Sequence, residues 1–253
     1  MKWLRTLVVL DQGDVINSAD WKTVHDSFVR SIQSIEHPEG TGALTLRQRV
    51  LVNGKFIRNG VKPLRTQFLK HMVETEGWRG EGLVDLAKTR PQVNTKRFPN
   101  QEDYAEPITS AFGGFDFATT APGGSKIAIE WETGNISSSH RSLNKLCIAL
   151  SSGIIQVGVL VVPSRQLYLH LTDRIGNIGE LSPYLSFWAS IRGTIERGLL
   201  AVTVVEHDHL SDDEAIPFLK QGKDGNAKKI NPPQTGQSGR PKVRTRKKPP
   251  ARR

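Results

Sequence analysis

Hydrophobic and polar positions repeat along this chain with two different periods, so both helices and strands are predicted. Some segments place apolar side chains every three to four residues, as one face of a helix does, and others alternate or run continuously apolar over short lengths. Residues 154–162 are nearly all apolar and β-branched, which is typical of a buried central strand. The predicted helices are 61–76, 137–151 and 183–191, and the predicted strands are 115–119, 126–133, 154–162, 166–171 and 199–205. The fold class is therefore mixed α/β, with 115–119 and 126–133 forming an antiparallel hairpin.

Length and composition predict one folded domain followed by a tail. The chain has 253 residues, of which 37% are hydrophobic, enough for one ordinary core. Residues 220–253 carry 12 lysines and arginines against one acid, Asp224, whereas the remainder carries 23 basic and 24 acidic residues. We expect a domain at residues 1–220 and a disordered basic tail at 221–253, because the tail has almost nothing to bury. Such a tail can add salt-sensitive DNA affinity, improve solubility or contact another component.

Several classes of protein are excluded by the sequence. A single cysteine, Cys147, excludes a disulfide scaffold and a cysteine-based zinc site. The longest apolar run, residues 154–162, is too short to span a bilayer. The first residues, MKWLRTLVVLDQGD, lack the features of a secretion signal. A reduced, cytoplasmic protein is therefore expected.

Charge within the near-neutral domain is sorted into blocks. No acid occurs between Glu39 and Glu74 or between Glu132 and Asp173, although basic residues lie in both intervals. This separation would allow one side of the domain to face phosphates while the domain stays near neutral overall. Ordinary scatter of surface charge explains the same pattern equally well.

The candidate chemistry lies in the predicted strand 126–133. Because strand side chains alternate, Glu130 and Glu132 share one face, and the hairpin brings Asp116 back beside Glu130. Three crowded acids are tolerated only where a cation neutralises them or protons are retained, and all-oxygen ligands suit Mg²⁺. The alternative is a solvent-facing acidic strand with lysine partners.

Beyond these acids, the sequence resembles a known family. Asp116, Glu130 and Glu132 are similar to the Asp…(Asp/Glu)-x-(Lys/Glu) metal pattern of a large nuclease fold, with Glu132 at the position where Lys is common. Residues 130–146, EWETGNISSSHRSLNKL, closely resemble the BamHI family of type II restriction endonucleases, as do residues 166–184 and, more weakly, 61–85 and 216–229. The likeness covers residues 40–230 and is expected to leave the first forty residues outside. It implies a restriction-endonuclease-like fold with a central mixed β-sheet flanked by helices.

The resemblance also implies the catalytic residues. Asp116, Glu130 and Glu132 match the family's active-site acids, and Glu81 matches a fourth acid at the metal site. The segment between Glu81 and Asp116 is longer here than in the family, so Glu102 or Glu106 is an alternative to Glu81. The implied Mg²⁺ ligands are Asp116, Glu130 and Glu81, with Glu132 as a general base or as a ligand that orients water.

Five further positions match the residues with which the family reads DNA bases. Their side chains have suitable chemistry. Arginine can donate two hydrogen bonds to guanine, aspartate can accept a hydrogen bond from cytosine, and Asn or Ser can hydrogen-bond adenine. From the residues alone, a helix cap, an exposed surface arginine and a local Asp–Arg ion pair explain them as well. The five positions are Asn135, Ser137, Arg141, Asp173 and Arg174.

The leading hypothesis is a homodimeric, Mg²⁺-dependent endonuclease that cuts double-stranded DNA at a palindrome, with GGATCC as the leading guess. It predicts 5′-phosphate and 3′-hydroxyl ends, and a cognate DNA methyltransferase as a partner implied by the family. Helices 137–151 and 183–191 are the candidate dimer contact, although Leu146, Cys147 and Leu150 could equally be buried within one protomer. The alternatives are a DNA-binding relative that has lost cleavage and a structural-interaction protein whose acidic strand is incidental.

Overall fold

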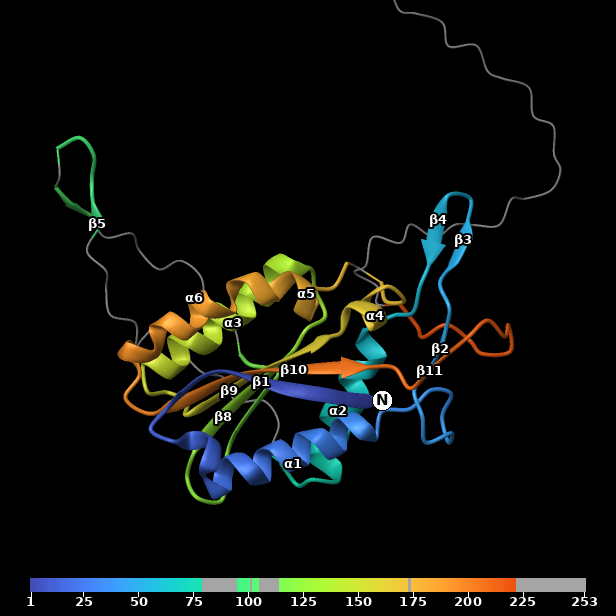
Figure 1. The fold of residues 1–253 in the computed structure, drawn as a ribbon, viewed down its shortest axis with the longest axis horizontal. Coiled ribbons are helices and arrows are strands. Elements are labelled where there is room, and N and C mark those ends of the chain that lie inside the picture. The colour runs from blue at the N-terminus through green and yellow to red at the C-terminus, as the bar shows by residue number, and fades with distance from the viewer. Residues whose placement is uncertain (79–94, 101, 105–113, 173, 222–253) are drawn as a thin grey trace, which may run out of the picture.

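A computed structural model describes residues 1–78, 95–100, 102–104, 114–172 and 174–221 (Figure 1). The strands are β1 (Lys2–Gln12), β2 (Thr45–Arg47), β3 (Val50–Val52), β4 (Lys55–Ile57), β5 (Thr95–Lys96), β6 (Asp103–Tyr104), β7 (Phe117–Thr120), β8 (Lys126–Trp131), β9 (Val157–Pro163), β10 (Gly198–Glu206) and β11 (His209–Ser211). The α-helices are α1 (Ala19–Gln33), α2 (Lys62–Glu74), α3 (Ile136–Ser151), α4 (Arg165–Tyr168), α5 (Ile178–Leu181) and α6 (Leu185–Ala189). Three 3₁₀ helices are η1 (Val15–Asn17), η2 (Ser182–Tyr184) and η3 (Ser190–Thr194).

A mixed five-stranded sheet forms the centre of the molecule, in the order β1-β10-β9-β8-β7. The inner strands β8, β9 and β10 run parallel, and the outer strands β1 and β7 pair antiparallel to their neighbours. Every residue of β9 is buried, as expected for a strand with partners on both edges and helices on both faces. The predicted central mixed sheet flanked by helices is thus confirmed.

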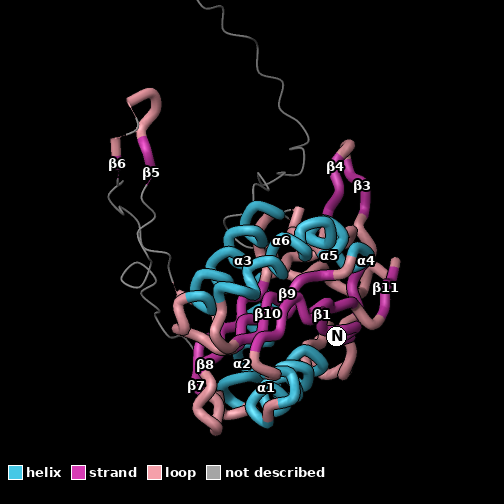
Figure 2. Tube along the Cα trace, turned by 60° about the vertical axis from the view of Figure 1, so that its left-hand side comes forward, coloured by secondary structure: helices cyan, strands magenta, loops and turns pink. Residues whose placement is uncertain are grey.

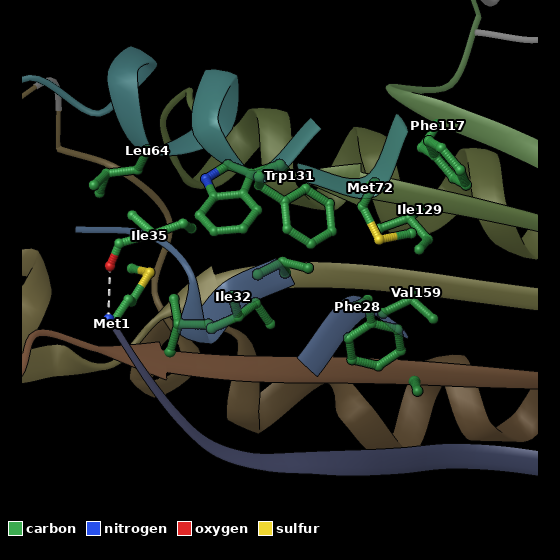
Figure 3. Packing of buried hydrophobic residues seen from close by; sticks show 14 of the residues in the cluster. Met1, Phe28, Ile32, Ile35, Leu64, Met72, Phe117, Ile129, Trp131 and Val159 are labelled. Carbon is green, nitrogen blue, oxygen red and sulfur yellow. Dashed lines mark hydrogen bonds between the residues drawn. The ribbon is translucent and has the colours of Figure 1, made fainter. Parts of the chain in front are cut away.

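Each face of the sheet carries its own hydrophobic core. On one face, α1 and α2 contribute residues at helical spacing, such as Phe28, Ile32 and Met72, which pack in one cluster with Ile129 and Trp131 (Figure 3). On the other face, α3, α5 and α6 bury a second cluster that includes Leu146 and Trp188. Figures 1 and 2 show these two helical layers on opposite sides of the strands. The sheet is therefore covered on both sides, which leaves its strand ends as the accessible places for chemistry.

Most predicted elements are found, with one error. The helices at α2 and α3, the hairpin β7–β8 and the strands β9 and β10 are confirmed, and residues 182–194 form consecutive helical turns. The strand predicted at 166–171 is wrong, because α4 occupies this segment. The Ser164 hydroxyl accepts a hydrogen bond from Leu167 N at 3.0 Å and caps the turn, and Leu167 turns inward and is fully buried.

The first forty residues are part of the folded domain. β1 pairs antiparallel with β10 from Lys2↔Glu206 to Gln12↔Gly198 and forms one edge of the sheet. Helix α1 begins at a Ser18 cap and buries Trp21, Val24, Phe28 and Ile32 against the sheet. The amino group of Met1 donates to Ile35 O at 2.7 Å and pairs with Asp208 at 2.7 Å. These residues therefore complete one core.

The predicted domain boundary and the predicted absence of a membrane-spanning segment can be compared only with the described residues. Residues 222–253 lie outside them, so the boundary between a domain at 1–220 and a tail at 221–253 stays a prediction. Within the described part of the chain, no helix is both long enough and apolar enough to cross a bilayer.

Candidate active site and DNA interface

The carboxylates of Glu130 and Glu132 lie at the carboxyl end of β8, on the face predicted from the alternation. Ile127, Ile129 and Trp131 point into the core beneath α1 and α2, whereas Glu130 meets α3 on the opposite side. Both glutamates are buried, with 6% of Glu130 and 4% of Glu132 exposed. The alternative of a solvent-facing acidic strand is therefore wrong.

Asp116 lies beside Glu130, just before β7 begins. The pairing of Phe117 with Ile129 sets this position, because the preceding residue then lies next to Glu130. The Asp116 carboxylate accepts from Trp131 N at 2.9 Å and from Arg65 Nη2 at 2.6 Å, so the backbone of β8 and helix α2 both hold it. Asp116 thus lies next to Glu130, and the negative charges of Asp116 and Glu132 both act on Glu130.

Glu130 forms a buried ion pair with Lys145, which reaches it from α3. Burial raises the pKa of Glu130 to about 7, although the Lys145 ammonium favours the charged form. Lys145 Nζ also donates to Gly114 O at 2.8 Å and lies 4.7 Å from the ring centroid of Phe115. The carboxyl group of Glu130 therefore gains or loses its proton near neutral pH.

Glu132 is held by the loop that follows β8. Its Oε1 accepts from Gly134 N at 2.6 Å, whereas Oε2 is buried without a hydrogen-bond partner of regular geometry in the described structure. Burial raises the pKa of Glu132, and Ser139 and the backbone of Gly134 partly oppose this change. A buried carboxylate oxygen without a partner is costly, and it can accept a proton or a cation.

The donor set suits a hard divalent cation, since every candidate ligand is a carboxylate oxygen. The buried Oε2 of Glu132, which lacks a hydrogen bond of regular geometry, is the atom that such an ion, or the water it binds, would satisfy. Among the described residues, however, no group of three or more His, Cys, Asp or Glu is arranged to hold a metal ion. Glu81 and its alternative Glu106 lie outside the described residues, and Glu102 is exposed beside the short β5–β6 pair. The metal-ligand assignment therefore stays a prediction.

The positions predicted to read bases lie on two adjacent segments. Asn135 forms an antiparallel bridge with Ile175, and Gly176 N donates to Gly134 O at 3.1 Å. Gly176 allows this close approach, because a Cβ there would lie 1.9 Å from Ser139 Oγ. Exposed side chains are thereby gathered beside the buried acids, namely Asn135, Ser137, Arg141 and Arg174.

The structure also bears on the alternative roles of these residues. The Asn135 side chain accepts from Ser138 N at 3.2 Å, so Asn135 does cap α3, and it remains exposed while doing so. Arg174 adopts a left-handed backbone with φ 51°, uncommon for a residue other than glycine. Asp173 lies outside the described residues, which leaves its pairing with Arg174 untested.

Sequence reasoning missed the two cations of the site, Lys145 and Arg65. Lys145 is 9% exposed and lies on α3 next to the buried Leu146 and Cys147. A lysine in such a position is a signal for a buried ion pair. Arg65 belongs to the acid-free block and carries no such signal.

The apolar residues of helix 137–151, proposed for a dimer contact, are mostly buried within the protomer. Leu146, Cys147 and Leu150 are buried in the second core, and burial raises the pKa of the Cys147 thiol to about 12. In contrast, Tyr184 and Phe187 are 48% and 65% exposed. A partner at this side would therefore meet residues 182–194 rather than the apolar stripe of α3.

The chain is similar in sequence to known proteins of one family. The sequence profile of the family described as Restriction endonuclease BamHI matches residues 1–226. The chain is 35% identical over 227 residues to the type II restriction enzyme OkrAI of Oceanobacter kriegii, covering 90% of this chain and 99% of the relative. It is 29% identical over 171 residues to the type II restriction enzyme BamHI of Bacillus amyloliquefaciens, covering 68% and 69%.

A solved structure shares the fold at low sequence identity. It is the restriction endonuclease BglII complexed with a DNA 16-mer, with a TM-score of 0.50 and 9% identity, and the match covers 85% of this chain and 78% of that one. The family match also begins at residue 1, so the expectation that the first forty residues fall outside the likeness is wrong. The physical reason is that β1 and α1 belong to the same sheet and core as the site.

Proposed function

This chain belongs to the BamHI family of restriction endonucleases and is a type II site-specific deoxyribonuclease, and we propose that it cuts both strands of a palindromic duplex, with GGATCC as the candidate site. The observation that supports this proposal is the convergence of Asp116, Glu130 and Glu132 next to the exposed Asn135 and Arg174. Endonucleases of this family generally use a divalent metal ion, and we assign Mg²⁺ to this protein.

The four acids take different roles in the proposed hydrolysis. Asp116, Glu130 and Glu81 would hold the metal ion, which would supply positive charge at the scissile phosphate and at the departing 3′-oxygen. Glu132 accepts the proton of the attacking water at Oε2, a role favoured by its raised pKa and by the absence of a regular hydrogen bond to that atom. The ends produced are a 5′-phosphate and a 3′-hydroxyl.

Recognition and assembly complete the proposal. Asn135, Ser137, Arg141, Asp173 and Arg174 read base edges, with the arginines directed to guanine. The protein acts as a homodimer in the cytoplasm, paired through the exposed side chains of residues 182–194, because a palindrome matches a twofold axis. A cognate DNA methyltransferase protects the host sequence.

Digestion of a plasmid carrying one GGATCC site tests the proposal. Wild-type protein with Mg²⁺ is expected to cut once, and sequencing of the ends identifies the position and the terminal groups. The matched control is the same plasmid with one base pair of the site changed. Asp116→Ala and Glu130→Ala are expected to slow cleavage by about a thousandfold or more while specific binding in EDTA is retained.

Two results would contradict the proposal. Specific binding without Mg²⁺-dependent cleavage by the wild type would identify a catalytically silent DNA-binding relative. Undiminished cleavage by Asp116→Ala and Glu130→Ala would show that the acids have been assigned wrongly.

A further inference from the structure

The β3–β4 hairpin, residues Val50–Ile57, projects from the domain on the side of α4 and α5 (Figures 1 and 2). Its tip is the pair Asn53-Gly54, with φ 51° and 71°, the backbone that a tight two-residue hairpin turn requires. Leu51 pairs across the strands with Phe56, and these side chains are 60% and 47% exposed. An isolated two-stranded ribbon is marginally stable in water, and exposed apolar side chains on such an element indicate a surface that contacts a partner.

Arginines lie on the same face of the hairpin as this apolar pair. The guanidinium carbons of Arg49 and Arg58 lie 4.5 Å and 5.5 Å from the ring centroid of Phe56. Lys55 is exposed next to the turn. The sequence contains no acid between Glu39 and Glu74 that would neutralise these charges locally. Arg47 is not included in this surface, because it pairs with Glu214 at 3.1 Å.

The hairpin is attached directly to the predicted base-reading loop. Asn59, which follows β4 and is fully buried, donates its backbone N–H to His170 O at 2.8 Å and accepts from Thr172 N at 2.8 Å. Its side-chain amide bonds Arg47 O at 2.8 Å and His170 O at 3.1 Å, which ties both ends of the hairpin to the segment leading to Arg174. The base of the hairpin is therefore tied to residues 170–172, a few positions before Arg174.

We propose that this hairpin is a DNA-contacting arm that holds the duplex just outside the recognised base pairs, an inference that rests on the proposed function. Arg49, Arg58 and Lys55 neutralise phosphates, and Leu51 and Phe56 pack against sugar and groove wall. The partner is a polyanion because Arg49 and Arg58 flank an aromatic ring, Lys55 adds a charge beside the turn, and residues 49–58 include no acid. A two-stranded ribbon also fits the roughly 12 Å width of the major groove.

The proposed arm is tested by measuring how DNA affinity depends on the length of the duplex and on the salt concentration. One duplex ends just outside the site, and a second extends by about one helical turn on each side. In EDTA, wild-type protein is expected to bind the long duplex more tightly, and Arg49→Gln/Arg58→Gln is expected to lose most of this advantage. Each protomer of the proposed homodimer loses two phosphate contacts, so the salt slope falls by about 3.6, and the wild type should lose on the order of a hundredfold more affinity than the variant between about 50 and 200 mM salt.

A matched control is Lys22→Gln/Lys126→Gln, which removes two charges from exposed lysines of α1 and of the start of β8, away from the hairpin. This control should keep the wild-type salt slope. Circular dichroism and melting temperature verify that both double variants are folded.

The failures of the two proposals are distinguishable. If the wild type cuts the short duplex at its site but the arginine variant keeps the full length advantage and salt slope, the arm is refuted and the nuclease stands. If the wild type shows no sequence preference on either duplex, the proposed function fails. A second variant is Leu51→Ser/Phe56→Ser. If it changes the oligomeric state and leaves DNA affinity unaltered, the hairpin binds another copy of the chain and the proposed arm is refuted.

Discussion

Replacement of Glu130 by glutamine is expected to stabilise the metal-free protein at and above neutral pH. Glu130 is 6% exposed, and burial raises its pKa from the ordinary 4.5 to about 7. Each pKa unit corresponds to about 1.4 kcal/mol, so the charged form costs the folded state roughly 3 kcal/mol. Glutamine is neutral at every pH and still offers Lys145 an oxygen, while Lys145 keeps its bond to Gly114 O. Some attraction for Lys145 is lost, so a net gain of about 1 to 3 kcal/mol is expected at pH 8.

The pH dependence supplies the sharper test. The raised pKa means that the folded wild type binds the proton more tightly than the unfolded chain. The stability contributed by this tighter proton binding is fully present below pH 4.5 and is lost as the pH rises through about 7. The advantage of Glu130→Gln should therefore be near zero at pH 4.5, grow between pH 4.5 and 7, and level off above pH 7.

Urea unfolding followed by circular dichroism in EDTA, repeated across this pH range, measures both free energies of unfolding. Glu39→Gln, at an exposed glutamate, is the matched control and should change stability by less than about 0.5 kcal/mol at every pH. A Glu130→Gln effect that stays constant from pH 4.5 to 8 would show that the burial of this charge has been misjudged.

Two further variants probe how the fold supports the site. Gly176→Ala should cost about 1 to 3 kcal/mol in thermal unfolding and weaken sequence-specific binding more than nonspecific binding, because its Cβ would meet Ser139 and shift the Arg174 segment. Gly193→Ala, where a Cβ meets nothing within 4 Å, should be nearly neutral, and equal losses in both would refute this explanation. Asp20→Asn should cost about 1 to 3 kcal/mol at pH 7, because the carboxylate accepts from the backbone of the β7–β8 turn at 2.7 and 3.0 Å. Burial opposes ionisation of Asp20, but these bonds lower its pKa below 3.8, so this cost should shrink in urea unfolding as the pH falls below that value; a cost that persists in acid would contradict the assignment.

The site combines groups that a stable core would avoid. Two buried glutamates, one with an oxygen that lacks a hydrogen bond of regular geometry, lie against Lys145 and beside the Arg65–Asp116 pair. Buried ion pairs contribute little net stability, because desolvation offsets their attraction. Their presence at the end of β8 is explained better by chemistry on DNA than by support of the fold.

Local pattern determined much of this protein. The period of two in residues 126–133 placed Glu130 and Glu132 on one face, and the apolar run at 154–162 indicated the buried β9. Helical spacing located α2 and α3, and Asn135 was recognised as a possible cap of α3. These features were predictable because they depend on residues a few positions apart, whose geometry follows from the backbone.

Only the tertiary structure decided which distant residues meet. Arg65 contacts Asp116 across 51 positions, and Asn59 bonds His170 across 111. The placement of β1 beside β10 and the helical form of α4 likewise depend on neighbours from other parts of the chain. No local period encodes such contacts, because they arise when separate apolar faces pack on one sheet and bring their polar residues together at its strand ends.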